Sequence, residues 1–205
     1  MRVATQPDAG GSATWGELIN QRARGIADTV ARWLEFTGVT PNMLTVMGFL
    51  LTLGVAYVIA SGYERLGGVL VVAAGLFDML DGAVARVRGL KTRFGGFLDS
   101  TLDRYSEAAL LGGVLVLYPD TQTAVVIVAA LAGSLLVSYT RARAEGLQPP
   151  VDCEVGWLPR PQRVVLLAAG LITGLVIPAL WVLAVLTNVT ALQRILHVRR
   201  ELGGR

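Results

Sequence analysis

Four aspartates stand close together in an otherwise apolar sequence. Asp78 and Asp81 are three residues apart, and Asp99 and Asp103 are four residues apart. At these spacings two residues share one face of an α-helix, so each pair can present two carboxylates to one site. Four acids at one site repel one another unless divalent cations neutralise them. Because no His or Cys lies nearby, these oxygen ligands favour Mg²⁺ or Mn²⁺ over zinc, and two such ions would suit a phosphoryl displacement.

Small residues follow the first aspartate pair. Gly82, directly after Asp81, removes a side chain where a nucleotide could approach the helix backbone. Ala85 lies one helical turn beyond Asp81, and its small side chain leaves space on the same face of the helix. One pair of aspartates at a helix end is usually a solvated surface feature. Here the aspartates belong to a pattern of eight positions: Asp78, Asp81, Gly82, Ala85, Arg86, Gly95, Asp99 and Asp103. Such a pattern is very unlikely to arise by chance, and it indicates a site for metal and nucleotide.

The composition around these residues is that of an integral membrane protein. Of the 205 residues, 53% are hydrophobic and 16% are charged, and the mean hydropathy is +0.57. The apolar runs are continuous, as in transmembrane helices, and lack the short alternating segments of a barrel. Basic residues alternate with these runs and line no single polar face, which excludes nucleic acid as a partner. The lone Cys153 excludes an internal disulfide.

We expect an all-α membrane protein with six transmembrane helices and one preceding amphipathic helix. Its parts are a flexible tail at 1–13, an amphipathic juxtamembrane helix at 14–38, the membrane domain at 39–198 and a basic tail at 199–205. The expected spans are 44–60, 66–84, 94–117, 121–145, 162–175 and a last span that follows a turn at Ile177 and Pro178 and ends near 196. Glycines that would allow close helix packing are Gly112, Gly113, Gly170 and Gly174.

Two features of this arrangement place the aspartates. The link at 87–94 is short, so the second and third spans are antiparallel neighbours and all four carboxylates can converge. Lys and Arg gather at the N-terminal helix, after the second span, after the fourth span and at the C-terminus, with only Arg65 on the other side. The positive-inside rule therefore predicts that both termini and the acidic site face the cytoplasm, with the chain in the cell membrane.

At these residues the chain resembles the CDP-alcohol phosphotransferase family. The family pattern DxxDGxxAR(x8)GxxxDxxxD is matched by Asp78, Asp81, Gly82, Ala85, Arg86, Gly95, Asp99 and Asp103. The resemblance implies six transmembrane helices after an amphipathic helix, a homodimer, and transfer from CDP-diacylglycerol to an alcohol with release of CMP. It also implies that the four aspartates hold two Mg²⁺ or Mn²⁺ ions and that Asp103 is the general base. The implied CDP-binding residues are Asn42, Asp78, Gly82, Ala85 and Arg86.

Arginines near the ends of the last three spans bear on the acceptor alcohol. They are Arg141, Arg143, Arg160, Arg163 and Arg194. Their ordinary role is anchoring at the cytoplasmic face, but several arginines above a metal site would also bind a phosphate through forked hydrogen bonds. The segments 139–145 and 160–163 resemble bacterial phosphatidylinositol-phosphate synthases, with Arg141 in place of a lysine. This implies a phosphorylated polyol, inositol 1-phosphate, as acceptor, with glycerol 3-phosphate as the alternative.

A cation transporter is an alternative of a different class, because intramembrane carboxylates also mark ion pathways. Transporter sites often lie near the bilayer midplane between repeated halves. Here the acids cluster at one membrane face, and no second DxxD occurs in the other half of the chain. We therefore favour the enzyme over a transporter or a non-catalytic lipid-binding scaffold.

Overall fold

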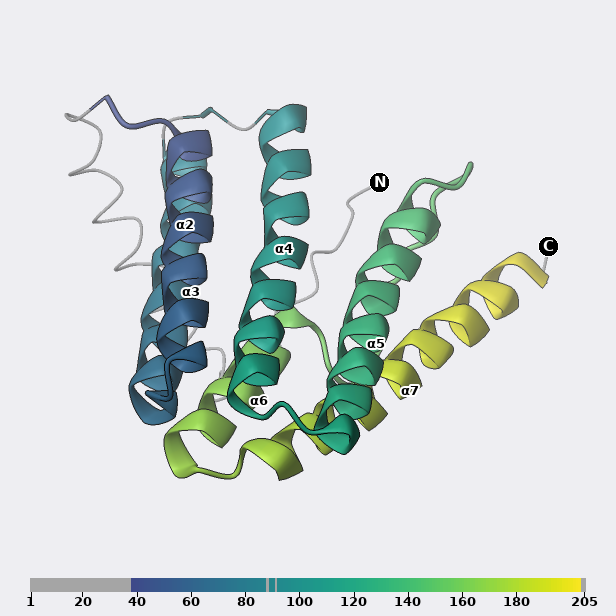
Figure 1. The fold of residues 1–205 in the computed structure, drawn as a ribbon. Helices are drawn as coiled ribbons and strands as arrows, with labels where there is room; N and C mark the ends of the chain where they lie inside the picture. The colour runs from purple at the N-terminus through teal and green to yellow at the C-terminus, as the bar shows by residue number, and fades with distance from the viewer. Residues whose placement is uncertain (1–37, 88, 91, 204–205) are drawn as a thin grey trace, which may run out of the picture.

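The computed structural model describes residues 38–87, 89–90 and 92–203, except for the side chain of Asp81. This part of the chain forms helices and no strand (Figure 1), which confirms the all-α expectation for the described residues. The helices are α2 (Pro41–Ala60), α3 (Glu64–Val87), α4 (Arg93–Leu117), α5 (Thr121–Glu145), α6 (Arg160–Thr173) and α7 (Val176–Gly203). The predicted amphipathic helix at 14–38 and the tail at 1–13 fall almost wholly outside the described residues.

Four of the described helices are long and apolar enough to cross a membrane: α2, α3, α5 and α7. The other two differ from them for separate reasons. α6 has only 14 residues, which is about 21 Å of helix and shorter than a hydrocarbon core. α4 has 25 residues, but its first half carries charged residues from Arg93 to Glu107. Large apolar side chains such as Leu50 on α2 and Trp181 on α7 are exposed, which suits helices that could lie in lipid.

Side-chain caps begin α4 and α5, two of the helices that carry predicted site residues. The Thr92 hydroxyl accepts a hydrogen bond of 2.9 Å from the backbone N–H of Gly95 at the start of α4. The Asp120 carboxylate accepts one of 2.9 Å from the backbone N–H of Thr123 at the start of α5. Because the first N–H groups of a helix have no partner within it, such caps fix where the helix begins.

The turn between α6 and α7 comes earlier than the sequence predicts. Gly174 ends α6 with a φ of +76°, a left-handed conformation that glycine adopts without a steric penalty. Pro178 then lies inside the first turn of α7, where its missing N–H costs no helical hydrogen bond. The predicted turn at Ile177 and Pro178 is therefore wrong. α7 also continues to Gly203, so most of the predicted basic tail at 199–205 is helical.

The helices pack in two groups that α6 connects. α2 packs against α3 and α4, α5 packs against α7, and α6 contacts both α3 and α7. By contrast, α4 and α5 share few contacts. Figure 1 shows these two helices joined by a short link at one end and diverging toward the other. The diverging ends belong to the N-terminal half of α4 and the C-terminal half of α5, which carry the predicted site residues.

Close backbone contact holds α4 against α2. A Cβ atom on Gly113 would lie 2.5 Å from the carbonyl oxygen of Ala56, whereas one on Gly112 would meet nothing within 4 Å. Gly170 lies in the same way against Ala179, where an added Cβ would be 2.6 Å from that side chain. Gly113 and Gly170 thus serve packing within one chain.

The substitution Gly113→Ala should lower the free energy of unfolding by about 1–3 kcal/mol relative to Gly112→Ala. The new methyl group meets a backbone oxygen, which cannot move as a flexible side chain would. Both variants gain the same helix propensity, so Gly112→Ala is the matched control. Thermal unfolding in detergent micelles measures the difference. Equal transition temperatures would mean that α2 and α4 are not in backbone contact at this point.

Candidate active site

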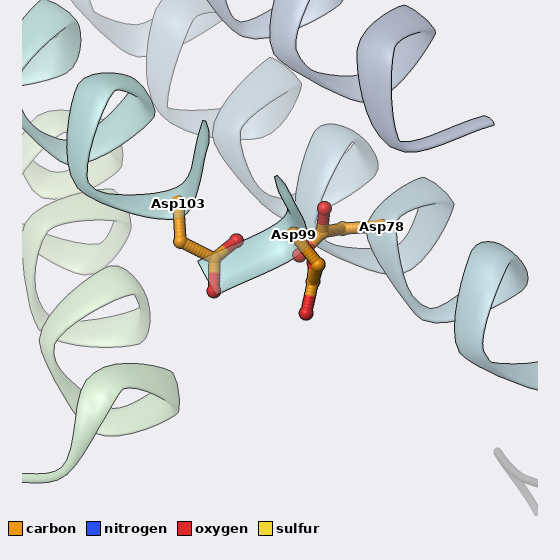
Figure 2. A group of neighbouring side chains, drawn as sticks. All are labelled: Asp78, Asp99 and Asp103. Atoms are coloured by element: carbon orange, nitrogen blue, oxygen red, sulfur yellow. The ribbon is translucent and has the colours of Figure 1, made fainter. Parts of the chain in front are cut away.

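Three carboxylates from α3 and α4 meet between these helices. Asp78, Asp99 and Asp103 each offer one oxygen, and these oxygens all lie within 4.8 Å of one another. Figure 2 shows the three side chains turned toward a common space, with Asp78 coming from α3 and the other two from successive turns of α4. Asp81 belongs to α3, but its side chain lies outside the described part of the structure. Three of the four predicted metal ligands are thus together.

This cluster fits a hard divalent cation. Its members are half-buried, and each provides oxygen at a distance from the others that one ion can bridge. Arg160, at the start of α6, also reaches two of them. Its Nη1 lies 3.0 Å from Asp78 Oδ2 and its Nη2 lies 2.7 Å from Asp103 Oδ1. The Arg160 guanidinium therefore compensates part of the negative charge of these carboxylates, which could also bind a metal ion.

A first cavity, which we name the α2–α4 cavity, lies on one side of the cluster. It has a volume of about 250 Å³ and reaches Asp99 of the cluster. Four of the predicted CDP-binding residues line it, namely Asn42, Gly82, Ala85 and Arg86. The other lining residues, apart from Asp99, are Pro41, Thr45, Leu90, Thr92, Gly95 and Gly96. Of these, Gly95 belongs to the family pattern described above.

A side chain at Gly95 would be crowded where α2 meets α4 at this cavity. A Cβ atom there would lie 2.9 Å from Thr92 Oγ1 and 3.0 Å from Asn42 Oδ1. A Cβ atom on Gly82 would lie 3.6 Å from Arg86 Nη1, which is ordinary contact. Gly95 therefore leaves room for the Thr92 cap and the Asn42 side chain, whereas the absence of a side chain at Gly82 leaves space in the cavity.

A second cavity, the α4–α5 cavity, opens on the other side of the cluster where these helices diverge. It has a volume of about 530 Å³ and also reaches Asp99 and Asp103. Arginines from four helices line it, namely Arg104, Arg141, Arg160, Arg163 and Arg194. Arg143 is exposed on α5 and is not among the residues that line this cavity. The structure thus brings four of the five predicted acceptor-binding arginines together.

Each of these arginines is held by specific partners. Arg163 makes a two-pronged pair with Glu107, with distances of 2.6 and 2.9 Å. Arg141 pairs with Glu145 and Glu154 at 2.7 Å each. These acids were not predicted as site residues, although Glu107 follows Asp103 at the same spacing by which Asp103 follows Asp99.

Arg194 differs from the other cavity arginines because its partners are backbone carbonyls. Its Nε donates to the Val155 oxygen at 2.9 Å and its Nη1 donates to the Val137 oxygen. The side chain is buried, and among the described residues no carboxylate lies within ion-pair distance of it. Arg194 therefore brings to the cavity a positive charge that has no ion-pair partner among the described residues.

The loop at 146–159 forms one wall beside these arginines. Its backbone accepts from Arg194 at Val155 and from Arg163 at Leu158, the latter at 3.2 Å. Its Cys153 packs with Ala144, and burial raises the pKa of the Cys153 thiol. The thiol thus has a packing role, and the arginines fix the loop.

The sequence model of the CDP-alcohol phosphatidyltransferase family matches residues 38–197. The chain belongs to this family, which confirms the resemblance drawn from its sequence. It is therefore a CDP-alcohol phosphotransferase enzyme.

Relatives of known activity cover nearly the whole chain. The archaetidylinositol phosphate synthase of Pyrococcus horikoshii is 33% identical over 188 residues, covering 90% of this chain and 96% of the relative. The phosphatidylinositol phosphate synthase of Corynebacterium glutamicum is 37% identical over 185 residues, covering 84% of each chain.

The crystal structures of one further synthase have the same fold. The Mycobacterium tuberculosis phosphatidylinositol phosphate synthase with CDP-DAG bound superposes with a TM-score of 0.78 at 31% identity, covering 85% of this chain and 94% of that chain. The same enzyme in complex with manganese and citrate gives a TM-score of 0.77 at 31% identity, covering 84% and 88%. A divalent metal in that relative agrees with the carboxylate cluster found here.

The substitution Asp99→Asn should weaken Mn²⁺ binding by about tenfold or more, because it removes a charged oxygen from the cluster. Titration of the purified protein with Mn²⁺, followed by electron paramagnetic resonance, measures the affinity. Glu201→Gln is the control, since Glu201 is exposed near the end of α7 and outside the cluster. Unchanged Mn²⁺ affinity in Asp99→Asn would rule out the cluster as the metal site.

Proposed function

We propose that this enzyme transfers a phosphatidyl group from CDP-diacylglycerol to a hydroxyl of inositol 1-phosphate, giving phosphatidylinositol phosphate and CMP. The observation that carries the proposal is the position of Asp99. It lines both the α2–α4 cavity and the α4–α5 cavity, so the two cavities meet at the carboxylate cluster. A donor in one cavity and an acceptor in the other would have their reacting groups at this meeting point.

The donor side is supported by the residues of the α2–α4 cavity. Asn42, Gly82, Ala85 and Arg86 would bind the CDP group there. Asp78 does not line this cavity and would act from the carboxylate cluster, which reaches the cavity through Asp99. The crystal structure of the Mycobacterium tuberculosis synthase contains CDP-DAG. Because Gly82 has no side chain, the cytosine ring of the CDP group would have room beside the helix backbone.

The reaction needs little beyond positioning, charge compensation and one proton transfer. The acceptor hydroxyl attacks the phosphorus that bears the lipid, and the bond from that phosphorus to the CMP oxygen breaks. Asp103 lies at the border of the α4–α5 cavity, where it would accept the hydroxyl proton as general base. Asp78, Asp81, Asp99 and Asp103 would hold two Mg²⁺ or Mn²⁺ ions, which when bound compensate the charge of the diphosphate.

The acceptor side is supported by the charges of the α4–α5 cavity. Arg194 brings a buried charge that has no ion-pair partner among the described residues, and Arg160 Nε is a buried donor with no hydrogen-bond partner among the described atoms. A phosphate would meet both needs, and Arg141 and Arg163 add directed donors. Both relatives described above are named as synthases of lipids that contain inositol phosphate, which favours that polyol over glycerol 3-phosphate. Arg143, which does not line this cavity, would contribute to binding of the acceptor phosphate from outside it.

Membership of an enzyme family disfavours the cation-transporter alternative. The proposal also covers the arrangement in the membrane. We infer six transmembrane helices after an amphipathic helix at 14–38, with both termini and the active site on the cytoplasmic face of the cell membrane. The Lys and Arg excess on that side supports this orientation. By analogy with the family, we expect a homodimer.

Purified protein with Mg²⁺ or Mn²⁺ and CDP-diacylglycerol should release CMP when inositol 1-phosphate is added, and release far less with glycerol 3-phosphate. Arg194→Gln should raise the KM for inositol 1-phosphate about 10–100-fold, because a charged hydrogen bond to the phosphate is lost. Arg200→Gln removes an exposed charge further along α7 and is the control. Preference for glycerol 3-phosphate would identify the alternative enzyme.

The substitution Asp103→Asn should lower kcat by about 10²–10⁴-fold, because asparagine cannot take the hydroxyl proton. The rate of CMP release at saturating substrates measures this loss. Calorimetry of Mn²⁺ and CDP-diacylglycerol binding shows whether the variant still assembles its substrates. CMP release at the wild-type rate would exclude Asp103 as the general base.

A further inference from the structure

Glu107 continues the acidic face of α4 by one helical turn, yet it serves a different partner. It follows Asp103 by four residues, as Asp103 follows Asp99. Among the described side chains, its carboxylate is not part of the group that Asp78, Asp99 and Asp103 form. Its two oxygens instead accept hydrogen bonds from Arg163, from Nε at 2.6 Å and from Nη2 at 2.9 Å.

This pair fixes the guanidinium of Arg163 in one orientation. The Arg163 side chain is 2% exposed and that of Glu107 is 11% exposed. Arg163 Nη1 also donates to the Leu158 carbonyl at 3.2 Å, so the guanidinium plane is held from two sides. These three hydrogen bonds engage three of its five N–H donors. Two N–H donors remain for a ligand.

The location of the pair assigns those donors to the acceptor side. Glu107 and Arg163 both line the α4–α5 cavity, together with Arg194, and neither lines the α2–α4 cavity. They also line a smaller cavity of about 50 Å³ that Asp78 and Asp103 border. Because the pair is neutral as a whole, Arg163 offers directed donors while Arg194 supplies the net charge. Removing Glu107 would free the Arg163 guanidinium to turn and leave its charge buried without a partner.

We propose that Glu107 is a positioning residue for the acceptor, which holds Arg163 so that its remaining N–H donors meet the phosphate of the polyol. The identity of that polyol rests on the function proposed above. Glu107 itself contacts neither substrate. Its removal should therefore weaken acceptor binding and leave CDP-diacylglycerol binding and the proton transfer intact.

The test compares steady-state kinetics of Glu107→Gln and Glu107→Asp with the wild type. Glu107→Gln should raise the KM for inositol 1-phosphate about tenfold or more, with kcat and the KM for CDP-diacylglycerol within about twofold. Glu107→Asp keeps the charge and should recover part of the loss. Glu64→Gln is the control, since Glu64 accepts a hydrogen bond of 2.6 Å from Tyr118 at the opposite end of α4. It should leave both KM values unchanged.

A second comparison separates positioning from a general effect on folding. In an Arg163→Gln background, Glu107→Gln should add little, because the two residues act as one unit. Calorimetric titration of the Mn²⁺-loaded protein with inositol 1-phosphate should show the same loss of affinity without turnover. Because Glu107→Asp retains the ion pair, it provides the comparison if the glutamine variants do not fold.

Several results would overturn the proposal. They are an unchanged acceptor KM in Glu107→Gln, an equal rise in both KM values, a fall in kcat alone, or full additivity with Arg163→Gln. A wild-type preference for glycerol 3-phosphate would instead overturn the proposed function. The same KM comparison made with that acceptor would then still decide the role of Glu107.

Discussion

The requirement that buried acids be matched by cations determines how this helical bundle is built. Asp78 and Asp103 face Arg160, and Glu107 faces Arg163. Both arginines come from the first turn of α6, the shortest described helix. A carboxylate held among apolar helices is costly unless a cation or metal stands beside it. The start of α6 is therefore placed at the depth of the acids on α3 and α4, and the preceding loop brings the chain there.

The same need to match buried acids with cations explains why the helices form two packed groups that meet at α4. α2 packs closely against α3 and against α4, the latter through contacts such as Ala56 with Gly113, and the three helices line the α2–α4 cavity. α5 packs against α7, where Gly133 lies directly against Thr187, and leaves α4 almost untouched. The polar faces of α4 and α5 thus diverge around the α4–α5 cavity. Asp99 faces both cavities from between the two groups.

Helical spacing accounts for what the sequence predicted well. Residues on one helix have a fixed relation, so the spacing of Asp99 and Asp103 was enough to predict a common face. Contacts between helices depend on packing, which spacing does not specify. That is why Glu107 was not recognised as the partner of Arg163, and why Arg143 was grouped with arginines that line the cavity. The turn at Gly174 was misplaced for a local reason, because Pro178 is equally compatible with a turn and with the first turn of a helix.

Charge compensation also limits what the α4–α5 cavity can bind. Arg163 is neutralised by Glu107, and Arg141 is neutralised by Glu145 and Glu154. Most of the positive charge in this cavity is thus already offset by the protein, and Arg194 is the buried exception. Such a cavity favours one phosphate over a polyanion, because a second phosphate would meet carboxylates. The directed N–H donors around the rest of its volume suit hydroxyl groups, so a singly phosphorylated polyol matches both the charge and the donors.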